Sequence, residues 1–130
     1  MISNPVGWFE IYVDNMERAK KFYESVFSVK LERLNSPEIK MYSPEIEMWS
    51  FPVAMNEFGA SGALVNMTGF SPARNSIIIY FSCEDCAQEE EKIKASGGKI
   101  KKSKFSIGQY GYITLGYDTE GNMIGLHSMQ

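Results

Sequence analysis

Two stretches decide the fold of this chain: VGWFEIYV at residues 6–13 and SIIIYFS at residues 76–82. In both, strongly apolar residues recur at every second position, which is typical of β-strands that bury one face. Each stretch leads into residues that can cap a helix, Asp14-Asn15 in the first case and Glu84-Asp85 in the second. The same strand-then-helix signal is therefore present once in each half of the chain.

An amphipathic helix is predicted after each of these strands. Apolar residues recur every three or four positions across residues 15–27, and Glu17 follows Asp14 at the spacing of a capping box. The second helix is expected to end at Gly97-Gly98, because glycine commonly terminates helices.

Three extended runs follow each helix, separated by turn residues. They lie at residues 29–34, 46–53 and 63–67 in the first half, and at 99–102, 111–117 and 123–128 in the second. Each half is thus a strand, a helix and three more strands. We expect one domain over residues 1–130, with module one at about 5–68, a linker at about 69–75 and module two at about 76–129.

The halves align without a gap through the first strand and helix, so Trp8 falls on Ile78 and Glu10 falls on Tyr80. Because side chains alternate along a strand, each strand has a more apolar face and an opposite face. The more apolar set is Phe9, Ile11, Val13, Ile77, Ile79, Phe81, Ile113, Leu115, Ile124 and Leu126. The opposite set is Trp8, Glu10, Tyr12, Ile78, Tyr80, Ser82, Tyr112, Thr114, Gly125 and His127.

The composition limits the classes of partner. The net charge of −3 argues against nucleic acid or an anionic membrane surface as the main partner. No apolar run reaches the ~18 residues of a membrane span, and the first five residues do not resemble a signal peptide. We therefore expect a cytoplasmic protein that engages neither nucleic acid nor membrane.

Two segments carry a resemblance to a known family. The first is residues 6–14, together with Ala19-Lys20-Lys21-Phe22-Tyr23, and the second is DTEGNMIGL at residues 118–126. They resemble the vicinal oxygen chelate superfamily of glyoxalases, bleomycin resistance proteins and dioxygenases, and within it the glyoxalase-related proteins of unassigned function. The resemblance implies an α+β fold of two tandem βαβββ modules. Their strands would form a curled, open, barrel-like mixed sheet with the helices outside and a cleft on the inner face. The more apolar set of strand residues would then face the helices, and the opposite set would face the cleft.

The resemblance also implies where a metal would bind, with one His or Glu ligand on each of four cleft strands. Three of those positions fall on Trp8, Ile78 and Gly125, and the fourth falls within residues 63–66, where only Asn66 offers an oxygen. We therefore expect no metal at the family's usual site and no other cofactor. A displaced site that uses Glu10 and His127 stays open as an alternative.

Glu10 and His127 are the candidate catalytic residues. A carboxylate in a partly desolvated cleft can act as a general base, and histidine titrates near neutral pH. Glu10 is also consistent with a charge at an open cleft mouth or a carboxylate paired with a lysine. His127 is also consistent with a hydrogen-bonded histidine near the C-terminus, or with one exposed by fraying. The candidate ligand-binding residues are Trp8, Tyr12, Ile78, Tyr80, Ser82, Tyr112 and Gly125.

The two cysteines form a CxxC pattern at a helix start, which can support redox chemistry. However, the repeat places Cys83 on Val13 and Cys86 on Met16, which are core positions. We therefore interpret both cysteines as small buried apolar residues.

Two functions are compatible with these features. The first is a protein that binds a small organic molecule in an aromatic cleft, similar to bleomycin resistance proteins. The alternative is a lyase or isomerase, similar to lactoylglutathione lyase, that acts on a small carbonyl compound by acid–base or displaced-metal chemistry. The resemblance further implies a homodimer.

Overall fold

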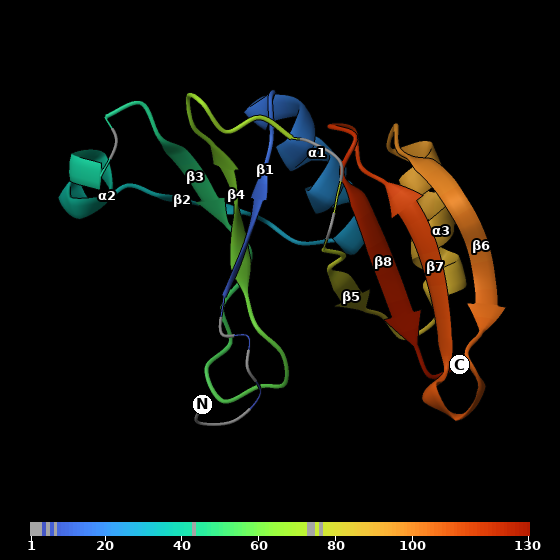
Figure 1. Ribbon diagram of the computed structural model, residues 1–130. Coiled ribbons are helices and arrows are strands. Elements are labelled where there is room, and N and C mark those ends of the chain that lie inside the picture. Colours follow the sequence, from blue (N-terminus) through green and yellow to red (C-terminus); the bar gives the residue numbers. More distant parts are fainter. Residues whose placement is uncertain (1–3, 5, 7, 43, 73–74, 76) are drawn as a thin grey trace.

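The computed structural model describes residues 4, 6, 8–42, 44–72, 75 and 77–130 (Figure 1). The elements in chain order are β1 (Phe9–Tyr12), α1 (Met16–Phe27), β2 (Glu32–Leu34), α2 (Pro37–Tyr42), β3 (Glu47–Ser50), β4 (Gly62–Asn66), β5 (Tyr80–Ser82), α3 (Cys86–Ala95), β6 (Lys99–Ser106), the short 3-10 helix η1 (Gly108–Tyr110), β7 (Tyr112–Tyr117) and β8 (Met123–Ser128). No helix among the described residues is long and apolar enough to cross a membrane.

The strands form two four-stranded mixed sheets with the same internal order. The first sheet is β1-β4-β3-β2 and the second is β5-β8-β7-β6. In each, the first strand pairs in parallel with the last strand of its module, and the other pairs are antiparallel. This common topology confirms the α+β class and the repeated βαβββ unit. In the described part of the chain, the sheets form no closed barrel, and the strands of each module pair with one another and not with those of the other module.

The two modules meet through their helices. α1 and α3 contact each other, and Figure 1 shows α1 at the junction between the sheets and α3 against the back of β6, β7 and β8. One buried cluster joins β1, α1, β4, α3 and β8, and includes Ile11, Phe22, Leu64, Ile93 and Leu126. Burying a side chain of this size contributes about 1.5–3 kcal/mol, so this shared core is the main cohesive element.

Both helices begin where the sequence predicts. The Asn15 side chain accepts a hydrogen bond from the Arg18 backbone N–H at 3.0 Å, and the Asp85 side chain accepts one from Ala87 N–H at the same distance. α1 ends at Ser28, whose φ of 54° lies in the left-handed region.

The turn at residues 118–122 joins module two to module one. Tyr23 on α1 is fully buried, and its hydroxyl donates to Asp118 Oδ2 at 2.6 Å. Asn122 Nδ2 donates to the Tyr12 carbonyl at 3.1 Å, which fastens the end of β1. The turn that resembles the family motif is therefore a clamp between the modules.

The neighbouring Glu120 completes this clamp. Its carboxylate accepts hydrogen bonds from the backbone N–H groups of Asp14 and Asn15, at 3.1 and 2.9 Å. Arg18 covers it with an ion pair of 2.7 Å, so that the Glu120 side chain has no exposed surface.

Several predicted elements differ from the structure. No helix is predicted between the extended runs at residues 29–34 and 46–53, where the structure has α2. Ser36-Pro37 is a helix-start signal there, because Pro suits the first helical position and Ser36 Oγ accepts a hydrogen bond from the Ile39 N–H at 3.3 Å. β6 continues to Ser106, beyond the predicted residue 102. β5 spans only Tyr80–Ser82, and Ile77, which was expected to face the helices, is 74% exposed.

Some predictions fall on residues outside the described set. These are Pro5 at the predicted start of module one, Gly7 in the first stretch, Ala73 and Arg74 in the linker, and Ser76 at the start of the second stretch. The module boundaries stay predictions.

Candidate functional site

Glu10 lies in the middle of β1, on the face turned away from the helices. Its register partner on β4 is Ala63, and its neighbours Phe9 and Ile11 pack on the helix side. The carboxylate accepts hydrogen bonds from the Tyr12 hydroxyl at 2.8 Å and from Trp8 Nε1 at 3.3 Å. These two neutral donors orient the carboxylate.

A pocket of about 300 Å³ opens beside this carboxylate, on the outer face of the first sheet. Its described lining comes from β1, from α2 and from β3 with the residue before it. The lining residues are Glu10, Tyr12, Glu38, Ile39, Ile46 and Met48. The volume lies at the lower end of the range of small-molecule sites, about 300–1,000 Å³.

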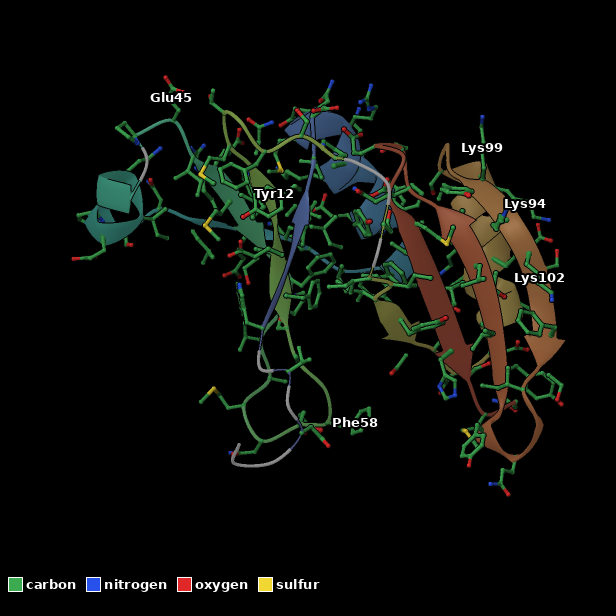
Figure 2. All side chains as sticks on the ribbon, in the orientation of Figure 1. Tyr12, Glu45, Phe58, Lys94, Lys99 and Lys102 are labelled. Atoms are coloured by element: carbon green, nitrogen blue, oxygen red, sulfur yellow. The ribbon has the colours of Figure 1, made fainter. Side chains whose placement is uncertain are left out.

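Apolar packing forms the base of this pocket. Ala63 and Val65 on β4 have no exposed surface, and Ile39 of α2 packs against the same cluster. The Tyr12 ring stacks on Phe70 with centroids 5.6 Å apart, and Figure 2 labels Tyr12 on the first sheet. The sequence did not point to Glu38 and Ile39 because it did not predict α2, which carries both. Ile46 lies just before β3, and it was missed because no local pattern shows that β3 lines the same pocket as β1.

Four other predicted site residues lie on the outer face of the second sheet: Tyr80, Ser82, Gly125 and His127. Tyr80 is the register partner of Gly125, and Ser82 is the partner of His127. The Tyr80 ring lies over Gly125, where a Cβ atom would collide with it. His127 Nε2 lies 2.7 Å from the Tyr110 carbonyl oxygen, so the imidazole is held by the η1 turn.

Ile78 precedes β5 and is half-buried, while its neighbour Ile79 packs against the shared core. The Gly125 N–H donates to the Ile79 carbonyl at 2.9 Å. Ile78 thus lies just before β5, beside these four residues.

The prediction for β7 was wrong, because Tyr112 and Thr114 face α3. Thr114 is fully buried, and its hydroxyl contacts Glu90 Oε1 at 3.1 Å and Cys86 Sγ at 3.5 Å. Tyr112 lies on the same face of β7 and packs against the shared core. Polar groups on α3 satisfy the threonine hydroxyl, so apolarity alone did not identify the buried face.

Glu10 and His127 are not brought together within the chain. Glu10 lies on the first sheet and His127 on the second, and among the described residues no hydrogen bond or ion pair joins them. The proposed acid–base pair therefore has no geometric support in a single chain.

The residues at the implied metal positions do not suit a divalent cation. Ile78 and Gly125 have no donor side chain, and the Trp8 indole N–H only donates hydrogen bonds. The strand registers place Ala63 opposite Glu10, as Gly125 is placed opposite Tyr80, so the fourth position also has no donor. No group of three or more His, Cys, Asp or Glu side chains in the described part of the chain could hold a metal ion.

The cysteines occupy core positions, as the repeat predicts. Cys86 is fully buried, and Cys83 is half-buried against the shared core. Burial and the nearby Glu89 carboxylate raise the pKa of the Cys83 thiol to about 12. A thiol with this pKa is not a nucleophile at neutral pH.

The comparisons with known proteins agree with this architecture. Residues 6–126 match the model of a family described as the Glyoxalase/Bleomycin resistance protein/Dioxygenase superfamily. No curated protein matches the sequence.

Solved structures show the same fold at low sequence identity. Glyoxalase I from Zea mays matches with a TM-score of 0.70 and 20% identity, covering 96% of this chain and 46% of the maize chain, so this chain spans less than half of that protein. A mutant of the fosfomycin resistance protein FosX from Listeria monocytogenes, complexed with Mn(II) and 1S,2S-dihydroxypropylphosphonic acid, matches with a TM-score of 0.69 and 20% identity, covering 100% and 95%. A hypothetical protein from S. aureus matches with a TM-score of 0.66 and 15% identity, covering 98% and 99%.

Proposed function

Because the chain belongs to the Glyoxalase/Bleomycin resistance protein/Dioxygenase superfamily, we propose that it binds a small organic molecule in the pocket over the first sheet. Binding would not use the family's usual metal site. The observation that carries this proposal is the Glu10 carboxylate, held by two neutral donors at the mouth of a pocket with apolar walls.

The charge of the pocket indicates the preferred ligand. Glu10 and Glu38 are the charged residues among its described lining, and both are acidic. The nearby Lys40 ammonium is directed to the Ile46 carbonyl oxygen at 3.3 Å. A ligand with an apolar body and a cationic group would place that group against Glu10, where a charge-assisted hydrogen bond can form.

A matched pair of probes tests this proposal: benzylamine, which is protonated at pH 7, and benzyl alcohol, which is neutral. We expect benzylamine to bind about fivefold more tightly in calorimetric titrations, the difference between a charge-assisted and a neutral hydrogen bond. Glu10→Gln should remove this preference. Glu17→Gln, on the exposed face of α1, is the matched control and should keep it. Absence of binding by both probes would contradict the proposal.

The proposal that binding is independent of metal has its own test. The purified chain, incubated with Mn²⁺ or Zn²⁺ and then dialysed, should retain well below one equivalent of metal in elemental analysis. One equivalent per chain would contradict it and favour the displaced-metal alternative.

The lyase or isomerase alternative stays a prediction. It needs Glu10 and His127 to act on one substrate, so any turnover of a small carbonyl compound should be lost in a Glu10→Gln, His127→Ala double variant. Turnover retained by that variant would exclude acid–base roles for these two residues.

The homodimer implied by the family is also a proposal. Light scattering should give the mass of two chains of 14.7 kDa each, and a monomer mass would contradict it. The cytoplasmic location and the absence of nucleic-acid partners stay predictions.

A further inference from the structure

A second pocket, of about 360 Å³, lies at the junction of the two modules and is separate from the pocket of Glu10. One wall consists of Phe9 on β1, Phe51 after β3 and Phe81 on β5. The opposite wall is the loop between β3 and β4, at residues 52–61. The two pockets share no described lining residue.

The aromatic wall is prebuilt. The ring centroids of Phe9, Phe51 and Phe81 lie 5.6 to 6.0 Å apart, so the three rings support one another. Phe81 also stacks on Phe27 of α1 at 4.4 Å, which connects this wall to the core. Gly62 lets the Phe9 ring lie directly on β4, because a Cβ atom there would approach that ring to 2.6 Å.

The opposite loop presents apolar side chains that the chain itself does not cover. Phe58 is 88% exposed, Met55 81% and Val53 60%. Figure 2 shows Phe58 at this loop, pointing away from the first sheet toward the side where the second module lies. Exposed apolar groups beside a cavity commonly mark a binding site.

Hydrogen bonds fix the base of the loop, where it leaves β3 and enters β4. The Phe51 N–H donates to the Gly62 carbonyl at 2.9 Å. The Ser61 hydroxyl lies 2.8 Å from the Pro52 carbonyl oxygen and 3.2 Å from that of Phe51.

The polar groups of the pocket select the charge of its ligand. Of the described residues that line it, only Glu57 is charged. An anionic ligand would be repelled by this carboxylate, whereas a cationic group on a flat ring would be attracted to it. The rings of the wall prefer a planar aromatic partner at centroid distances of 4.5–7 Å.

We propose that this inter-module pocket is a second ligand site, which takes a planar aromatic cation between Phe58 and the Phe9–Phe51–Phe81 wall. The proposal does not depend on the function of the pocket at Glu10.

Two tricyclic fluorescent probes test it: 9-aminoacridine, which is a cation at neutral pH, and 9-anthracenecarboxylate, which is an anion. The cation should bind saturably and the anion more weakly. Phe58→Ala should weaken binding of the cation about tenfold, by removing one stacked ring, and Phe58→Trp should retain it. Because Phe58 is almost fully exposed, neither change should unfold the chain, which circular dichroism verifies.

Ile77→Ala is the matched control, because Ile77 is also an exposed apolar residue, at 74%, and lines neither pocket. It should leave 9-aminoacridine binding unchanged. Unchanged affinity in Phe58→Ala, loss of binding in Ile77→Ala, or no binding by the native chain would each overturn the proposal. Glu57→Gln should reduce the preference for the cation over the anion. An unchanged preference would overturn the inference that Glu57 selects a cationic ligand.

Discussion

The Tyr23 hydroxyl is the most sharply testable contact between the modules. Tyr23→Phe removes one oxygen atom from a fully buried site and leaves the ring packing in place. Burial, and then the Asp118 carboxylate, raise the pKa of Tyr23 well above its usual value, so the phenol stays protonated and donates. Asp118 retains hydrogen bonds from the Glu120 and Asn122 N–H groups, each at 2.8 Å.

The expected cost is that of one buried hydrogen bond to a charged acceptor, about 1.5–3 kcal/mol. For a chain of this size, each kcal/mol lowers the melting temperature by roughly 3–5 °C. Urea denaturation should show a lower midpoint with an unchanged m-value, because the surface exposed on unfolding is the same. The matched control is Tyr110→Phe, since Tyr110 is 66% exposed, and it should change stability by less than about 0.5 kcal/mol. A similarly small loss in Tyr23→Phe would refute the inter-module clamp.

Three further predictions concern other buried contacts. Burial by itself raises the pKa of Glu120, but hydrogen bonds from Arg18 and the Asn15 N–H outweigh this effect, so the pKa of Glu120 lies below its usual value. A carboxyl group whose pKa is lowered by folding stabilises the folded state above about pH 4.5, and this stabilisation is lost as the pH falls. Glu120→Gln should therefore lose less stability than the native chain between about pH 5 and pH 3, as measured in urea titrations. Gly125→Ala should cost about 1–2 kcal/mol in thermal unfolding, and clearly less in a Tyr80→Ala background, because the new Cβ atom collides with that ring. Cys83 should react with iodoacetamide at pH 7 far more slowly than a free thiol, as its pKa of about 12 requires, and mass spectrometry measures this rate. The first prediction would be contradicted if Glu120→Gln and the native chain lost stability equally as the pH falls. The second would be contradicted by an equal cost of Gly125→Ala in both backgrounds, and the third by rapid alkylation of Cys83.

The alternating strands and their caps were predictable because both signals are local. Phe9, Ile11 and Val13 face the helices as expected, since one face of β1 is clearly more apolar than the other. In β7 the same rule predicted the wrong face. Ile113 and Leu115 are strongly apolar but only half-buried, whereas Thr114 between them is fully buried. Its hydroxyl is satisfied by Glu90 on α3, and no pattern within β7 records that partner.

The candidate site was predictable in part. Trp8, Glu10 and Tyr12 lie together because they share one face of a strand. The walls that turn this face into a pocket come from α2 and β3, and their placement over β1 depends on long-range pairing. The expected partnership of Glu10 with His127 stays a prediction, because these residues lie on strands of different sheets, β1 and β8, and no local pattern determines how two sheets are placed relative to each other.

The sequence by itself determined the repeat, the caps of both helices and the absence of donors at three implied metal positions, because periodicity and residue chemistry are carried by the chain. Only the tertiary structure decided that the eight strands form two sheets, that the Asp118–Asn122 turn clamps module two to Tyr12 and Tyr23, and that two separate pockets result. Those features arise from packing between residues far apart in the chain, and the energy of such contacts depends on geometry that no local pattern specifies.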